Sequence, residues 1–207
     1  MSIEAQVLNP WLTMWTRPRA TIQQIVSSDP QKHILTLAAI GGISQALDRA
    51  SMRNLGDEHD LGFILAVSLI GGPIAGVMSL YLFGALLKWT GGWLGGAGSF
   101  INIRAAMAWS YVPLIWALLL WVPQLVIFGK DLFSSDTPNI DQSPFVMLGF
   151  GLLAIIVAIW TIVVFLKALG QVQGFSAWRA LGNTLAAAFV VAAPIILLVL
   201  VFARGQP

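Results

Sequence analysis

The sequence predicts an all-α fold: a polytopic membrane helix bundle with five transmembrane helices and N-terminal interfacial helices. Of the 207 residues, 57% are hydrophobic and only 10% are charged, and the mean hydropathy is +0.82. A soluble domain of this composition would expose large apolar patches, so the bilayer is the expected solvent. Five apolar runs, residues 34–50, 61–87, 105–128, 146–166 and 182–203, make up a membrane domain spanning residues 34–203. Four of the runs are long enough for a helix of ~20 residues to cross a ~30 Å hydrocarbon core.

Residues 1–33 are predicted to form a cytoplasmic interfacial segment. Trp11 and Trp15 recur at helical spacing, and prolines stand where two short helices would begin. Tryptophan prefers the level of the lipid headgroups, and Arg17 and Arg19 can reach lipid phosphates. We interpret the segment as a topological anchor, with a partner-docking surface as the alternative.

Small residues and prolines mark the apolar runs. Small residues recur every fourth position in the first two runs, at Ala38, Gly42 and Ala46 and at Ser68, Gly72 and Gly76. This spacing predicts close helix packing, because backbones can approach where lipid offers no hydrophobic drive for association. Four prolines lie within the runs, at Pro73, Pro113, Pro123 and Pro194. Structural kinks are the favoured interpretation, and broken transport helices are the alternative.

The distribution of charge predicts the orientation in the membrane. With the N-terminus cytoplasmic, seven of the eleven basic residues lie inside, namely Arg17, Arg19, Lys32, Lys88, Arg104, Lys167 and Arg179. The positive-inside rule therefore places the C-terminus and the tail of residues 204–207 outside. A basic inner face suits anionic lipids and gives no reason to expect nucleic acid as a partner.

Residue types that carry catalysis or bind metals are sparse, so we expect no enzyme, cofactor or metal site. The absence of cysteine excludes thiolate ligands and cysteine nucleophiles. His59 lies within Asp57-Glu-His-Asp60, but consecutive side chains rarely converge on one ion, so a solvated acidic loop is predicted. The glycines from Gly91 to Gly98 lack the Gly-Lys-Ser/Thr of a phosphate-binding loop, which leaves a flexible turn or a close-packed helix end.

Polar residues at membrane depth are the remaining functional candidates, because they cost free energy unless they pair or face water. They are Gln45, Asp48, Arg49, Tyr111 and Asn183. Asp48 and Arg49 are adjacent and cannot share a helix face, so each requires a different partner. Kinked spans surrounding Asp48, Tyr111 and Asn183 would make a transporter or channel for ions or small solutes.

A weak internal repeat relates the second and third runs to the fourth and fifth. Phe100-x-x-x-Arg104-Ala opens the third run and Phe175-x-x-x-Arg179-Ala opens the fifth, and in each case a lysine directly follows the preceding run. Two similarly oriented hairpins are therefore predicted, with Arg104 and Arg179 in equivalent places at cytoplasmic helix starts. A cation there opposes the helix dipole, so lipid phosphates or a polar partner would have to retain it.

Several motifs together resemble a known family. They are Asn9-Pro-Trp11, Arg17-Pro-Arg19, Gly91-Gly-Trp-Leu-Gly-Gly-Ala-Gly98-Ser-Phe, Arg104-Ala-Ala-Met-Ala-Trp-Ser-Tyr-Val-Pro113 and Gln173-Gly-Phe-Ser-Ala-Trp-Arg-Ala180. With these, residues 9–203 resemble the Yip-one domain family. For its eukaryotic members the resemblance implies multi-span proteins of early secretory membranes that associate with Rab-type GTPases and with each other. This chain lacks their long polar N-terminal region and is more similar to the short bacterial members, which implies a bacterial inner membrane.

The expected function is that of a non-enzymatic integral membrane protein of Yip-like class, which acts in membrane organisation or trafficking through contacts with lipids and proteins. Lipid or partner contact is assigned to Trp11, Trp15, Arg17, Arg19, Arg104 and Arg179. Membrane lipids are the first expected partners, and protein partners or a homo-oligomer come next. A transporter or channel is the alternative, and it would require a continuous polar path through the bundle.

Overall fold

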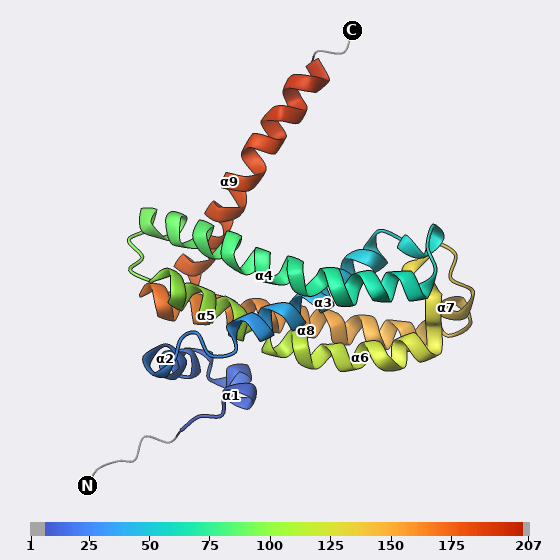
Figure 1. Ribbon diagram of the computed structural model, residues 1–207, viewed down its shortest axis with the longest axis horizontal. Coiled ribbons are helices and arrows are strands. Elements are labelled where there is room, and N and C mark those ends of the chain that lie inside the picture. Colours follow the sequence, from blue (N-terminus) through green and yellow to red (C-terminus); the bar gives the residue numbers. More distant parts are fainter. Residues whose placement is uncertain (1–6, 205–207) are drawn as a thin grey trace.

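The computed structural model describes residues 7–204, and every element in this range is helical (Figure 1). In chain order they are α1 (Pro10–Thr16), α2 (Pro18–Ser28), α3 (Ile34–Met52), η1 (Leu55–Asp57), α4 (Leu61–Trp93), α5 (Phe100–Ser110), α6 (Val112–Phe128), η2 (Gly129–Phe133), α7 (Pro138–Gln142), α8 (Pro144–Gln173) and α9 (Ala177–Arg204). The predicted all-α class is confirmed. Residues 1–6 of the N-terminal segment and 205–207 of the predicted tail lie outside the described residues.

Among the residues that the structure describes, three segments are long and apolar enough to cross a membrane: α4, the stretch Phe100–Phe133 and α8. Large apolar side chains such as Ile70 and Ile156 are exposed on them, where lipid is a more favourable neighbour than water. These helices make the chain a membrane protein. α3 does not meet the same criteria, because polar and charged residues occupy its second half. The count of five spans therefore stays a prediction.

The third apolar run forms two helices. α5 and α6 meet at Tyr111, and Pro113 lies in the first turn of α6, where its missing N–H costs no helical hydrogen bond. The span predicted at residues 105–128 therefore begins inside α5 and crosses a break. α4, α6 and α9 continue past their internal prolines, Pro73, Pro123 and Pro194.

α3, α4, α6 and α8 lie alongside one another, and α9 leaves this bundle obliquely (Figure 1). The packing of the two predicted hairpins is reciprocal. α5, the second helix of one hairpin, packs against α8 of the other, while α9 packs against α4. The start of α9 provides this contact through Ala180, Asn183 and Ala187, which are buried.

The contact between α3 and α4 is a backbone contact made by small residues. A Cβ atom on Gly72 would lie 2.9 Å from the carbonyl oxygen of Gly42, and one on Gly76 would lie 2.8 Å from the Cα atom of Gly42. Neither distance leaves room for a side chain. The predicted packing through every fourth small residue is confirmed for this pair of helices.

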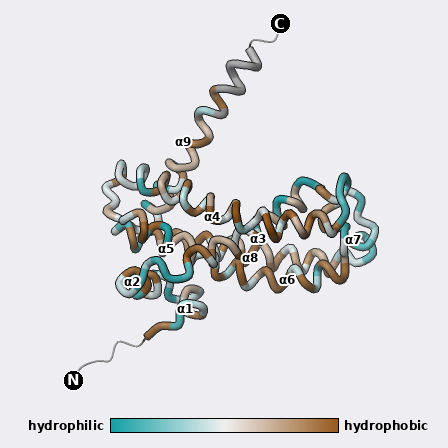
Figure 2. Tube along the Cα trace, in the orientation of Figure 1, coloured by the Kyte–Doolittle hydropathy of each residue, from teal (hydrophilic) through white to brown (hydrophobic). Residues whose placement is uncertain are grey.

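The two ends of the bundle differ in charge. The end we call the basic end comprises α1, α2, the α4–α5 turn and the α8–α9 turn. The opposite end, here the acidic end, comprises η1, η2, α7 and their connections, and it carries Asp57, Glu58, Asp60, Asp131, Asp136 and Asp141. Figure 2 shows hydrophilic residues gathered around α7, with hydrophobic residues along α6 and α8 between the two ends.

The N-terminal helices pack against the bundle with their apolar stripe. Met14 and Ile22 are completely buried and belong to the main hydrophobic core together with residues of α5 and α8. Leu12, on the outer side of α1, is 62% exposed. The two short helices predicted for this segment are present, and their apolar stripe faces protein.

Candidate functional site

A buried polar network closes the basic end. Asn183 of α9 donates from Nδ2 to the carbonyl oxygen of Leu87 at 3.1 Å, and its Oδ1 accepts a 2.6 Å hydrogen bond from the Thr90 hydroxyl. Gln173 of α8 also donates to Leu87, at 3.1 Å, and accepts from the backbone N–H of Gly98 at the same distance. Asn183 and Thr90 are completely buried and Gln173 is 2% exposed. The network therefore ties α4, α8 and α9 together.

The glycine-rich turn between α4 and α5 is shaped by Gln173. A Cβ atom on Gly98 would lie 3.0 Å from Oε1 of Gln173, and a Cβ atom on Gly96 would lie 2.7 Å from the ring of Phe175. The close-packed interpretation is confirmed for Gly91, Gly96 and Gly98, whereas nothing lies within 4 Å of a Cβ atom on Gly92. Gln173 was not among the predicted site residues, although it opens the motif at the second turn.

Arg104 packs against two aromatic rings. Its Cζ atom is 4.5 Å from the ring centroid of Tyr81 and 4.6 Å from that of Phe100. The side chain is 8% exposed, and its Nε atom is buried without a hydrogen-bond partner among the described residues. Cation–π contacts stabilise the guanidinium but do not replace the hydrogen bonds that it makes in water.

Arg179 repeats this stacking and adds a protein acceptor. Its Cζ atom lies 5.0 Å from the ring centroid of Phe175, four residues earlier, just as Arg104 stacks on Phe100. Its Nη2 atom donates to the carbonyl oxygen of Leu94, the C-cap residue of α4. Arg179 therefore neutralises the C-terminus of α4, where a cation is favourable. The repeat is reproduced in the stacking and differs in the acceptor.

The N-terminal tryptophans contact protein. Trp11 meets Trp109 of α5 edge to face, with ring centroids 5.7 Å apart. Trp160 of α8 donates from Nε1 to the carbonyl oxygen of Trp15 at 3.0 Å. Trp11 and Trp15 are each half-buried. Only the exposed part of each side chain can therefore make the predicted contact with lipid.

The two N-terminal arginines differ in their surroundings. Arg19 donates from Nη2 to the carbonyl oxygen of Phe175 at 3.4 Å, which links α2 to the α8–α9 turn. Arg17 is exposed where α1 ends and α2 begins. Both guanidinium groups lie at the basic end, as the sequence predicts.

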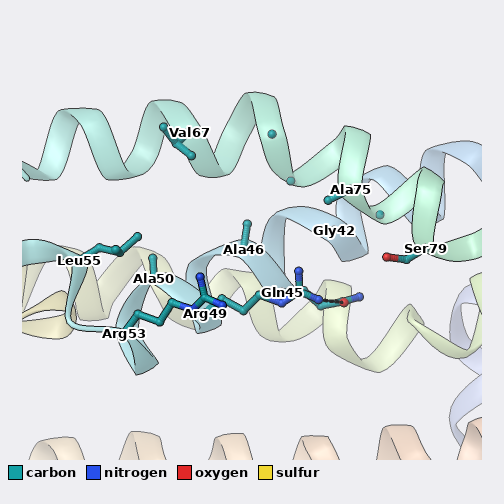
Figure 3. Close-up of a pocket in the computed structure, with 13 residues that line it drawn as sticks. Gly42, Gln45, Ala46, Arg49, Ala50, Arg53, Leu55, Val67, Ala75 and Ser79 are labelled. Atoms are coloured by element: carbon teal, nitrogen blue, oxygen red, sulfur yellow. Dashed lines mark hydrogen bonds between the residues drawn. The ribbon is translucent and has the colours of Figure 1, made fainter. Parts of the chain in front are cut away.

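A groove of about 180 Å³ runs between α3 and α4 (Figure 3). Gln45 and Arg49 of α3 and Arg53 at its C-cap line it on one side, and small residues of α4 line it on the other. Arg49 donates to Oε1 of Gln45 at 3.4 Å. Asp48 lines a different cavity, between α3, α6 and α8, so the adjacent charges use separate faces as predicted.

The transport candidates are not brought together. Tyr111 lines a mainly apolar cavity of about 310 Å³ between α4, α5, α8 and α9, and Gln45 reaches the same cavity. Asp48 faces the separate cavity, and Asn183 is held in the buried network. A shared polar chamber formed by Asp48, Tyr111 and Asn183 is therefore not the arrangement found.

The acidic loop holds the acidic end together. Asp57 accepts a 2.9 Å hydrogen bond from the backbone N–H of Ser135, joining the α3–α4 connection to the α6–α8 connection. Hydrogen bonding from Ser135 lowers the pKa of Asp57 below its ordinary value of 3.8. His59 packs on Phe63 with ring centroids 4.4 Å apart. Within the described part of the chain, no group of three histidine or acidic side chains could hold a metal ion.

Comparison with known proteins identifies the family. No curated protein and no solved structure matches the chain. The family model for the Yip1 domain matches residues 12–202, which begin within α1, include the α4–α5 and α8–α9 turns and reach the last turn of α9. The chain therefore belongs to the Yip1 domain family.

Proposed function

We propose that the protein organises its membrane through lipid and protein contacts made at the basic end, without catalysis. The observation that carries the proposal is that the polar groups at that end are hydrogen-bonded inside the protein, whereas basic groups there are exposed. Asn183, Gln173 and Thr90 are satisfied inside the protein. Arg17 and Lys88 are exposed, and basic groups at a membrane surface attract anionic headgroups.

The proposed location is a bacterial inner membrane, with the basic end at the cytoplasmic face and the C-terminus outside. The seven basic residues that the positive-inside rule places in the cytoplasm lie at or near the basic end, and this grouping supports the orientation. The proposed sites of lipid or partner contact are Trp11, Trp15, Arg17, Arg19, Arg104 and Arg179. Of these, the tryptophans, Arg19 and Arg179 already have partners in the protein, which favours Arg17 and Arg104 as contacts to lipid.

The second candidate function is a transporter or channel for ions or small solutes. The observation in its favour is the cavity lined by Tyr111, Gln45 and the hydroxyl-bearing Thr161 and Thr184. The hydroxyls of Thr161 and Thr184 bond carbonyl oxygens of their own helices, at 2.8 and 2.9 Å. Such hydroxyls are already paired and offer little to a permeating ion, so this candidate ranks second.

One reconstitution separates the two functions. The full chain is placed in liposomes of phosphatidylcholine containing a minority of phosphatidylglycerol, each lipid carrying a fluorescent reporter in turn. We expect energy transfer from protein tryptophans to show enrichment of phosphatidylglycerol around the protein, with ion and solute flux equal to that of empty liposomes. Flux above empty liposomes without lipid enrichment would favour the transporter. In-membrane crosslinking of the same samples identifies protein partners or a second copy.

A further inference from the structure

We infer that Arg104, which packs against Tyr81 and Phe100, is a specific binding site for the phosphate group of an anionic phospholipid in the leaflet at the basic end. The inference rests on the proposed function and deepens it. In this proposal, one guanidinium binds one lipid per protein chain, whereas a general basic surface would bind lipids through many residues.

Arg104 has a buried hydrogen-bond donor without an acceptor among the described residues. Its side chain is more than nine-tenths buried, and its Nε atom lacks a partner. No carboxylate, carbonyl or hydroxyl among the described residues accepts a hydrogen bond from its guanidinium, whose Cζ atom lies 4.5 Å and 4.6 Å from the two ring centroids. A buried guanidinium is costly until an acceptor meets its edge, and phosphate oxygens match that edge in a bidentate arrangement.

The stem of the Arg104 side chain packs closely against α4 and the neighbouring rings. Gly84 lies under it: a Cβ atom at this position would be 3.0 Å from Cγ of Arg104 and 3.2 Å from the ring of Phe100. The rings of Tyr81 and Phe100 meet in a T-shaped arrangement, with centroids 6.2 Å apart. The absence of a side chain on Gly84 therefore lets the stem pack closely against α4, with the guanidinium beside both rings.

Arg104 lies at the depth in the membrane where a phospholipid carries its phosphate group. α4 has 33 residues, so it is about 50 Å long and exceeds the ~30 Å hydrocarbon core. Trp89 and Trp93, near its C-terminus, are more than half exposed and suit the headgroup layer. Gly84 lies slightly deeper, where headgroups meet acyl chains, and Lys88 is exposed one turn further along α4.

The surroundings favour a lipid over free phosphate. Leu82 and Phe83, beside Tyr81 on α4, are 62% and 42% exposed and offer acyl chains an apolar surface. A soluble anion would have to leave water to reach Arg104, while a phospholipid already has its phosphate at this depth and gains contacts for its chains.

The repeat supplies a matched control. Arg179 stacks on Phe175 as Arg104 stacks on Phe100, but it already donates to Leu94. Arg179→Gln removes the same charge from the same end of the molecule without removing an unpaired guanidinium. If any basic residue sufficed, the two variants would behave alike.

The test is titration of the full chain, purified in a neutral detergent, with phosphatidylglycerol, phosphatidylcholine or inorganic phosphate, read by native mass spectrometry. We expect one phosphatidylglycerol to bind the unchanged protein more tightly than phosphatidylcholine, with no saturable inorganic phosphate. Arg104→Gln should weaken that binding roughly ten- to hundred-fold, and Arg104→Lys should weaken it less. Gly84→Ala keeps the charge and should also weaken it, because the stem is displaced.

Three results would overturn the inference. One is unchanged phosphatidylglycerol binding by Arg104→Gln, and another is an equal loss in Arg179→Gln. The third is saturable binding of inorganic phosphate at Arg104, which would make it a soluble-anion site. Helical circular dichroism and gel filtration identify misfolded variants; if Arg104→Gln fails these checks, Arg104→Lys and Gly84→Ala decide. Loss of the lipid site with retained lipid enrichment in liposomes would leave the broader proposed function standing.

Discussion

Polar side chains make buried hydrogen bonds at the basic end and exposed hydrogen bonds at the acidic end. At the basic end, Asn183 and Thr90 are completely buried and hydrogen-bond each other, and leaving either group unpaired there would cost roughly 1–3 kcal/mol. At the acidic end, Asp57 is exposed and holds one connection to another through Ser135. The contact between Asn183 and Thr90 is shielded from solvent. The contact between Asp57 and Ser135 is exposed and depends on pH.

Replacing Asn183 should destabilise the basic end. Asn183→Leu removes the acceptor of Thr90 and one donor to Leu87, and we expect the free energy of unfolding in detergent to fall by about 1–2 kcal/mol. Thr184→Val is the control, because its hydroxyl bonds Ala180 within its own helix. An equal loss of stability in both variants would contradict a special role for the network.

The contact of Asp57 with Ser135 should weaken in acid. The folded-state pKa of Asp57 is lowered from 3.8, so its contribution is complete above that value and is lost as the pH falls through the lower folded pKa. We expect the Ser135 amide to be protected from hydrogen exchange near neutral pH, after correction for the intrinsic rate. That protection should fall when the carboxylate is protonated. Asp57→Asn should lower the protection at neutral pH, and a pH-independent difference between the two proteins would contradict the mechanism.

At the scale of elements, the sequence predicted composition-driven features well and packing partners poorly. The apolar runs located α3, α4, α8 and α9, because burial in lipid requires continuous hydrophobic stretches. It did not foresee the break at Tyr111, since helix–helix packing decides whether a proline bends or interrupts a helix. Asn183 stood out as a polar residue within an apolar run, but its partner Thr90 did not. Gln173 was missed because it lies at the end of its helix, where a polar residue looks like ordinary solvent-facing sequence.

The backbone contact between α3 and α4 gives a prediction at this scale. Gly42→Val would place a branched side chain against the backbone of Gly72 and Gly76, and we expect the free energy of unfolding to fall by roughly 1–3 kcal/mol or more. Gly149→Ala in α8 is the control, because nothing lies within 4 Å of its added methyl group. Thermal unfolding in detergent measures both, and a Gly42→Val protein as stable as the control would contradict the contact.

For the whole molecule, charge separation is the property that the sequence predicted most directly. Six acids gather in the two connections at one end, while Lys88, Arg104, Lys167 and Arg179 belong to the other. The separation follows from chain order alone, because successive long helices return the chain to alternate ends. It carries the proposed orientation, with the basic end in the cytoplasm.

Reporter fusions test that orientation. A reporter fused after Lys88 or Lys167 should be cytoplasmic, and one fused after Pro207 should be extracytoplasmic, since seven of the eleven basic residues fall on one side. The readout is a pair of reporters, one active only inside the cell and one active only outside. Reversal at these positions would reject the N-in orientation, and a cytoplasmic signal after Pro207 alone would reject the five-span count.

The glycine contact also joins two helices of unequal length. α3 has 19 residues and α4 has 33, about 28 Å against about 50 Å, and the backbone contact at Gly42 makes them tilt as one body. In a thinner bilayer the long helix reduces its hydrophobic mismatch by leaning over, and it takes the short helix with it. The depth of Arg49 and Arg53, near the end of the short helix, then follows the thickness of the bilayer.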